Sequence, residues 1–133
     1  MARPYAILPP SGAARYETLA WVFFNAAGPG PTIGQLGYFT KFAPEKVPAA
    51  IDRHTKETDR LLQVLDRRLG QVPYLAGEFS IADLMNFTWP RAMKTFLRMD
   101  LSGYPHLSRW LAELEARPAI QRALALAPAK PAA

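Results

Sequence analysis

Few side chains in this 133-residue sequence could carry acid–base or nucleophilic chemistry. There is no cysteine, which excludes disulfides, thiolate metal sites and a cysteine nucleophile in this chain. The two histidines are His54 and His106. His54 falls on an apolar helical stripe, which favours the edge of a core or a subunit contact, and no second ligand is placed to complete a metal site with it. The residues alone therefore identify no catalytic group and no metal site.

The arrangement with the clearest chemical role is Ser80 followed three residues later by Asp83, at the start of an apolar run. This is the spacing of a capping box, in which each side chain accepts a hydrogen bond from the backbone N–H of the other residue. Phe79 and Leu84 have the spacing of a hydrophobic staple around the cap. A cap and a staple before so apolar a helix indicate a buried folding device rather than a catalytic role for Asp83.

The apolar spacing elsewhere predicts an all-α bundle of five to seven helices, with no strand. Gly28 is expected to close the first helix in the left-handed conformation. Residues 31–43 are expected to form an irregular turn or a short helix, and Pro90 to bend the capped helix near residues 86–89. The capped helix, the longest helix and the helix of Trp110 are expected to build the core. The main helices are expected over residues 12–27, 44–69, 81–98, 104–117 and 118–126.

Length and composition indicate one domain with a substantial core. We expect an extended, proline-rich arm over residues 1–10, the helical domain over 11–127 and a loose tail over 128–133. No apolar run approaches the ~20 residues of a membrane span, and the N-terminus lacks a signal-peptide core, so we expect a cytoplasmic protein without a membrane partner.

The formal net charge of +5 does not indicate a nucleic-acid partner. Acidic and basic residues interleave along the longest predicted helix, and Asp52 and Lys56 are spaced as an ion pair on one helix face. Mixed signs on one helix are typical of a solvated face. We therefore expect no nucleic-acid binding.

Residues 75–83, Leu-Ala-Gly-Glu-Phe-Ser-Ile-Ala-Asp, resemble the hallmark of the C-terminal all-helical domain of the glutathione S-transferase family. Residues 61–69, 104–111 and 116–123 are similar to the flanking segments of that domain in content, order and spacing. Residues 28–46 are similar to the bacterial Nu-like members. The resemblance extends from Ser11 to Leu126.

The resemblance implies a division of labour between two domains. In this family an N-terminal thioredoxin-like domain binds glutathione and activates its thiol, because the thiolate is the competent nucleophile. The helical domain supplies much of the pocket for the second, electrophilic substrate and much of the dimer contact. The pattern of a thioredoxin-like domain is absent from these residues. We therefore expect no catalytic residue and no cofactor in this chain, and glutathione only where a thioredoxin-like domain is supplied.

The resemblance also implies substrate-binding candidates. Four lie on the first predicted helix, which lines the cleft in the family, and two lie in the Gly-rich segment after it. In that segment Leu36, Gly37 and Tyr38 replace a more polar, histidine-containing run of the relatives. Aromatic residues at helical spacing are also typical of a core. The candidates are Tyr16, Trp21, Phe24, Asn25, Gln35 and Tyr38.

Three functions remain open. The chain could be the substrate-pocket and dimerisation domain of a glutathione S-transferase-related protein, with little or no glutathione conjugation on its own. It could instead be a non-catalytic protein–protein interaction module, or a protein that binds small hydrophobic ligands. The expected partners are a second copy in a homodimer or a separately encoded thioredoxin-like domain. Since large apolar patches are rare on stable monomers, we expect the arm of residues 1–10, or self-association, to cover the first helix and residues 31–42.

Overall fold

A computed structural model describes residues 7–126, which form an all-helical bundle. The predicted fold of five to seven helices is confirmed by six α-helices, with two π-helical turns in addition. Within residues 7–126 the only β-type pairing is two isolated bridges in the loop after the longest helix. The elements are α1 (Gly12–Ala27), α2 (Pro29–Gly37), η1 (Tyr38–Phe42), α3 (Pro48–Leu69), α4 (Ile81–Ala92), η2 (Met93–Leu97), α5 (Pro105–Glu115) and α6 (Pro118–Ala125).

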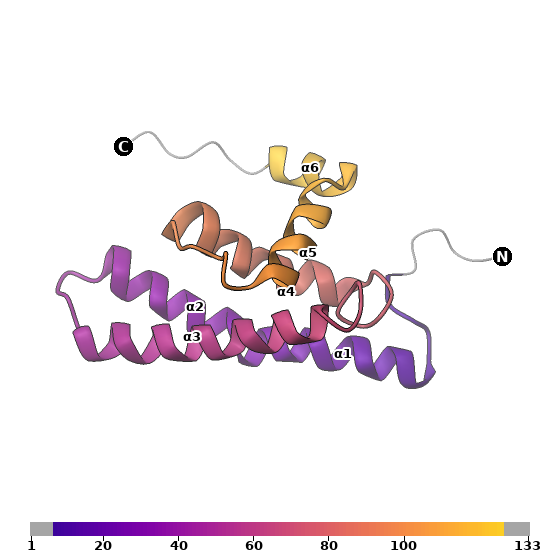
Figure 1. The fold of residues 1–133 in the computed structure, drawn as a ribbon, viewed down its shortest axis with the longest axis horizontal. Helices are drawn as coiled ribbons and strands as arrows, with labels where there is room; N and C mark the ends of the chain where they lie inside the picture. The colour runs from indigo at the N-terminus through magenta and orange to yellow at the C-terminus, as the bar shows by residue number, and fades with distance from the viewer. Residues whose placement is uncertain (1–6, 127–133) are drawn as a thin grey trace.

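The bundle is built from helices that pack on one another in pairs. α1 and α2 follow each other closely, and α3 runs back beside them (Figure 1). α4 packs on α1, and α5 packs on both α3 and α4. None of the helices that the structure describes combines the length and apolarity needed to cross a bilayer.

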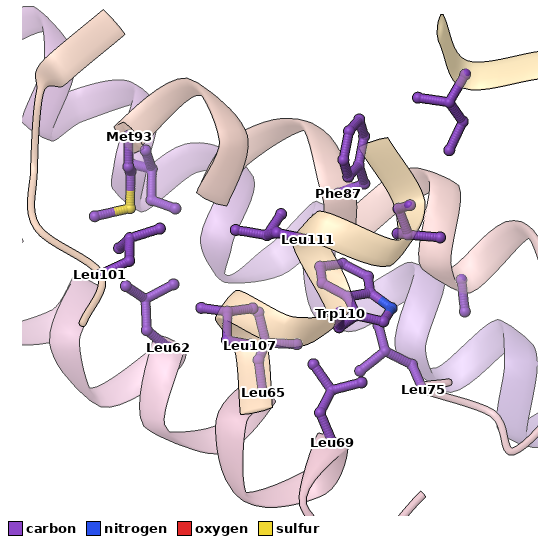
Figure 2. Packing of buried hydrophobic residues seen from close by; sticks show 14 residues of the cluster. Leu62, Leu65, Leu69, Leu75, Phe87, Met93, Leu101, Leu107, Trp110 and Leu111 are labelled. Carbon is purple, nitrogen blue, oxygen red and sulfur yellow. The ribbon is translucent and has the colours of Figure 1, made fainter. Parts of the chain in front are cut away.

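The core lies between α3, α4 and α5, as the sequence predicts. Leu65 of α3 and Leu107 and Trp110 of α5 are completely buried (Figure 2). The ring of Phe87, from α4, packs edge-on against Trp110 with 6.5 Å between the ring centroids. This packing fixes α4 against the α3–α5 pair.

One predicted backbone conformation and one predicted helix start are wrong. Gly28 does not adopt a left-handed conformation (φ −116°, ψ −89°), because the chain turns directly into α2 and Gly28 is the N-cap of that helix. The longest helix begins at Pro48 rather than Pro44. A proline disfavours helical geometry in the residue before it, and Val47 is accordingly non-helical (φ −116°, ψ 86°).

The capped helix is α4 continued by η2. The α-helical pattern runs through residues 86–89, where the sequence predicts a bend, and gives way to the π turn only at Met93. Arg98 ends this segment in the left-handed conformation (φ 58°). Of the predicted arm, residues 7–10 are described and non-helical. The carbonyl of Ile7 accepts a hydrogen bond of 2.8 Å from the backbone N–H of Ile81. The predicted tail, residues 128–133, lies outside the described residues.

Candidate functional site

An apolar cleft of about 220 Å³ opens between the end of α2 and the end of α4. One wall is formed by α2 and η1, and the other by α4 and η2. The lining residues are Ile33, Gly34, Gly37, Tyr38 and Phe42 from the first wall and Trp89, Ala92, Phe96 and Leu97 from the second.

Two glycines let the walls approach each other. A β-carbon on Gly34 would lie 3.4 Å from the ring of Trp89, and one on Gly37 would lie 3.8 Å from the side chain of Leu97. Because neither glycine has a side chain, the Trp89 indole packs directly against the backbone of α2. The α2 side of the cleft therefore carries no projecting side chain at these two positions.

Each wall ends in a π turn, and an aromatic pair closes the space between the two turns. The rings of Phe42 and Phe96 are stacked, with centroids 5.9 Å apart and an interplanar angle of 18°. Phe42 is 66% exposed and Phe96 is 52% exposed. π turns within helices are frequent at functional sites. Two large, exposed and mutually stacked rings form a surface to which a flat apolar molecule can bind.

The cleft contains few polar groups. Among its nine lining residues, the polar side chains are Tyr38 and Trp89, and the indole N–H of Trp89 lies toward Gly30, which does not line the cleft. Tyr38 packs edge-on against Phe39, which in turn stacks on His54 with 5.9 Å between the ring centroids. The Tyr38 phenol can orient a ligand by hydrogen bonding, but it is not a general base at neutral pH. The cleft is built for binding apolar groups rather than for proton transfer.

The structure brings one of the six predicted substrate-binding residues, Tyr38, into this cleft. Gln35 is exposed on α2 and does not line it. Trp21 and Phe24 pack against the hydrophobic core, edge-on to each other with 5.3 Å between the ring centroids. Asn25 is only 4% exposed.

Tyr16 completes the predicted set. It is 72% exposed near the start of α1, outside the residues that line the cleft. Most of the predicted residues lie on α1, whereas the second wall of the cleft is formed by α4 and η2. The helical spacing of Trp89, Ala92 and Phe96 on the capped helix is the signal that could have indicated that wall.

The capping box is present at the start of α4, and its Asp83 carboxylate accepts more hydrogen bonds than the sequence predicts. The backbone N–H of Ser80 donates to Asp83 at 2.9 Å, and the Ser80 hydroxyl accepts from the N–H of Ala82 at 3.2 Å. Asp83, which is fully buried, also accepts from the N–H of Leu75 at 3.1 Å and from the indole Nε1–H of Trp110 at 2.9 Å. A carboxylate held by this many donors serves as a structural acceptor.

The histidines do not form a metal centre. His54 lies half-buried against Phe39. His106 is exposed, and its ring lies so close to Gly70 that a β-carbon on Gly70 would be 2.9 Å from it. In the part of the chain that the structure describes, no three His, Asp or Glu side chains are grouped so that they could hold a metal ion.

Comparison with known protein families gives a match over most of the chain. The model described as "Glutathione S-transferase, C-terminal domain" matches residues 30–118. Two of the most similar curated relatives are the disulfide-bond oxidoreductase YfcG of Escherichia coli and the glutathione S-transferase-like protein tpcF of Aspergillus fumigatus. YfcG is 42% identical over 111 residues, covering 83% of this chain and 51% of the relative. The protein tpcF is 37% identical over 118 residues, covering 79% and 52%.

Solved structures show the same correspondence. A glutathione transferase from Burkholderia graminis, with two glutathione molecules bound per subunit, matches with a TM-score of 0.87 and 37% identity, over 93% of this chain and 55% of its own. A glutathione transferase family member from Pseudomonas fluorescens, also with two glutathione bound, matches with a TM-score of 0.85 and 38% identity, over 89% and 55%. The chain spans about half the length of the curated relatives it matches.

Proposed function

This chain belongs to the glutathione S-transferase family through its C-terminal helical domain, and we propose that it acts as the substrate-pocket and dimerisation domain of a glutathione S-transferase-related protein. The observation that carries the proposal is the apolar cleft between the two π turns. It offers stacked aromatic rings and a phenol, which suit the binding of a hydrophobic second substrate.

The volume of the cleft limits what it can hold. At about 220 Å³ it is smaller than the roughly 300–1,000 Å³ typical of sites for drug-sized ligands. We expect it to hold one small apolar group, such as a substituted benzene ring, while the rest of the substrate extends past Phe42 and Phe96. The reacting atom of such a substrate would then lie at the mouth of the cleft, where a thiolate from a second domain could reach it.

We propose that the chain by itself conjugates glutathione slowly or not at all. The thiol of glutathione needs a group that lowers its pKa, and the resemblance assigns that group to a thioredoxin-like domain. The helical residues match about half of each relative. Glutathione is therefore proposed as a cofactor only where a thioredoxin-like domain is supplied, which could be a separate polypeptide.

Chemistry of the kind named for YfcG, disulfide-bond oxidoreduction, would face the same requirement. This chain has no cysteine. Any disulfide exchange would have to use thiols from outside this chain, such as those of glutathione, of the substrate or of a thioredoxin-like domain. In that case too, the helical chain would contribute binding and orientation.

A second candidate function, the binding of small hydrophobic ligands without conjugation, rests on the same cleft. The exposed and stacked pair of Phe42 and Phe96 favours it, because both residues remain more than half exposed within residues 7–126 and present apolar surface to a ligand. The two functions differ in whether a bound electrophile reacts when activated glutathione is present.

The proposal is tested with anilinonaphthalene sulfonate, a dye that fluoresces in apolar sites, and with chlorodinitrobenzene plus glutathione. We expect the purified chain to bind the dye and to give no conjugation above the uncatalysed rate. The variant Gly37→Leu places a side chain in the cleft and should weaken dye binding about tenfold, equivalent to ~1.4 kcal/mol. Gly103→Leu is the matched control, because a β-carbon there meets nothing within 4 Å.

Rapid conjugation by the chain alone would overturn the proposed division of labour. Equal dye binding by both glycine variants would overturn the assignment of the cleft. Conjugation that appears only when a thioredoxin-like domain is added would favour the transferase function over simple ligand binding.

A further inference from the structure

A second cavity, of about 260 Å³, lies between α3 and the loop of residues 98–104 and shares no residue with the apolar cleft. Its inner wall is apolar. Leu62 and Met93 are each 1% exposed and Leu101 is 7% exposed, and the three side chains converge at one end of the core (Figure 2). Met99 adds a second flexible thioether to the lining. Methionines adapt to differently shaped apolar ligands, so this wall can accommodate a small hydrocarbon body.

A buried hydroxyl without a partner belongs to the same cavity. Thr58 of α3 lines it and is 1% exposed, and its Oγ1 makes no hydrogen bond with any part of residues 7–126. Buried hydroxyls are almost always paired, because leaving one unpaired forfeits its hydrogen bond to water. This hydroxyl is an unpaired polar atom in the wall of the cavity, shielded from solvent by its neighbours.

The mouth of the cavity carries two carboxylates. Asp59 accepts hydrogen bonds from the Tyr104 hydroxyl and from the Gln63 side chain, the latter at 2.8 Å. Asp100 accepts from the backbone N–H of Ser102 at 2.9 Å and from its hydroxyl at 2.7 Å. These hydrogen bonds from Ser102 lower the pKa of Asp100 below its ordinary value, so it is ionised at neutral pH.

Neither carboxylate has a cationic partner in the described structure. The ion pairs formed within residues 7–126 involve Asp52, Glu57, Glu17, Glu113 and Glu115, and none involves Asp59 or Asp100. The neighbouring lysine, Lys94, pairs with Glu115 at 3.7 Å. The cavity thus combines an apolar interior, an unused hydroxyl and a negatively charged mouth.

We propose that this cavity is a binding site for a small hydrophobic amine. The apolar body would lie against Leu62, Met93 and Met99, near the Thr58 hydroxyl. The ammonium group, with three donors and no acceptor, would lie at the mouth between Asp59 and Asp100. Charge-assisted hydrogen bonds to carboxylates are the strongest contacts available to such a ligand. The site is independent of the cleft and of the proposed transferase function.

Three molecules of the same shape test the charge requirement: phenethylammonium, phenethyl alcohol and phenylacetate. The readout is the NMR signals of the methionine methyl groups in the full chain, with Met93 and Met99 as reporters. We expect phenethylammonium to shift both signals, phenethyl alcohol to bind about tenfold more weakly and phenylacetate to give no shift.

Variants locate the site. Asp59→Asn and Asp100→Asn should each weaken phenethylammonium binding about tenfold, whereas Asp52→Asn, which removes an exposed carboxylate elsewhere on α3, should leave it unchanged. Thr58→Val should raise the melting temperature without ligand, because it removes an unpaired buried hydroxyl. The proposal is overturned if phenethylammonium shifts neither methionine, if phenylacetate binds equally well, or if both carboxylate variants bind as the unmodified chain does.

Discussion

Asp83 joins three parts of the chain through one carboxylate. It accepts hydrogen bonds from the backbone N–H groups of Leu75 and Ser80 and from the indole of Trp110. We predict that Asp83→Ala lowers the free energy of unfolding by about 3 kcal/mol or more, since each buried donor left without an acceptor costs roughly 1–3 kcal/mol. Urea unfolding followed by tryptophan fluorescence measures this loss.

Ser80→Ala is the matched control for that prediction. It removes the cap hydroxyl, including that hydroxyl's long contact of 3.4 Å to Asp83, but leaves the carboxylate and its three N–H donors in place, so it should cost only about 1 kcal/mol. If Asp83→Ala were no more damaging than Ser80→Ala, the carboxylate would not be the group that connects the loop, the helix start and Trp110.

Tyr104 gives a prediction about alkaline pH. Burial, and then the hydrogen bond to Asp59, raise the pKa of its phenol from 10.0 to about 12. Because the unfolded chain releases this proton at lower pH than the folded chain does, the stabilisation is complete below pH 10.0 and is lost as the pH rises from there to about 12. We predict that Tyr104→Phe unfolds with a smaller loss of stability across that window, as measured by urea midpoints at each pH. Parallel losses in the two proteins would contradict the assignment.

At the scale of elements, glycines determine how closely α2 approaches its neighbours. A β-carbon on Gly30 would lie 3.0 Å from the backbone oxygen of Asn25 and 3.3 Å from Nε1 of Trp89. A backbone oxygen cannot move aside easily, so we predict that Gly30→Ala destabilises the fold by about 1–2 kcal/mol despite the better helix propensity of alanine. Gly34→Ala, whose β-carbon would meet only the Trp89 ring at 3.4 Å, should be close to neutral. Thermal unfolding compares the two, and equal melting temperatures would refute the prediction.

The elements differ in how far the sequence predicts them. α1, α5 and α6 have local start signals, and their predicted bounds agree with the structure to within two residues. The start of α3 was predicted wrongly because both Pro44 and Pro48 suit a first helical turn, and only the geometry of Val47 selects the second. The π turns were not predicted, because apolar spacing does not distinguish a π turn from the α-helix that it continues.

The cleft was harder to predict than the helices. Tyr38 was identified through the family resemblance, but the wall of Trp89, Phe96 and Leu97 depends on contact between segments about 55 residues apart in the chain. Periodicity marks these residues as apolar without distinguishing a cleft from a core. Trp21 and Phe24 have the same kind of spacing and were predicted to bind substrate, but they pack against the core.

For the whole molecule, the main open surface is the outer side of α1. Tyr16 is 72% exposed and Phe23 is 68% exposed, and with Ala20 and Ala27 they form one apolar stripe along the helix. The described arm residues leave these two aromatic rings uncovered, although Ile7 is hydrogen-bonded at the start of α4. The sequence predicts that either the arm or self-association covers this surface. Because the described arm residues do not cover it, we consider self-association.

We predict that the chain forms a two-fold dimer through this stripe, the commonest symmetry of soluble homo-oligomers. A two-fold axis near the stripe brings each substituted residue close to its own copy, so the double variant Tyr16→Glu with Phe23→Glu would place like charges together and should yield a monomer. Ala119→Glu, which adds a charge on the exposed side of α6, should remain a dimer. Sedimentation velocity at several concentrations measures the association state. If the unmodified chain is a monomer at the highest concentration, the prediction of a dimer is wrong. If the double variant is still a dimer, the dimer forms through another surface.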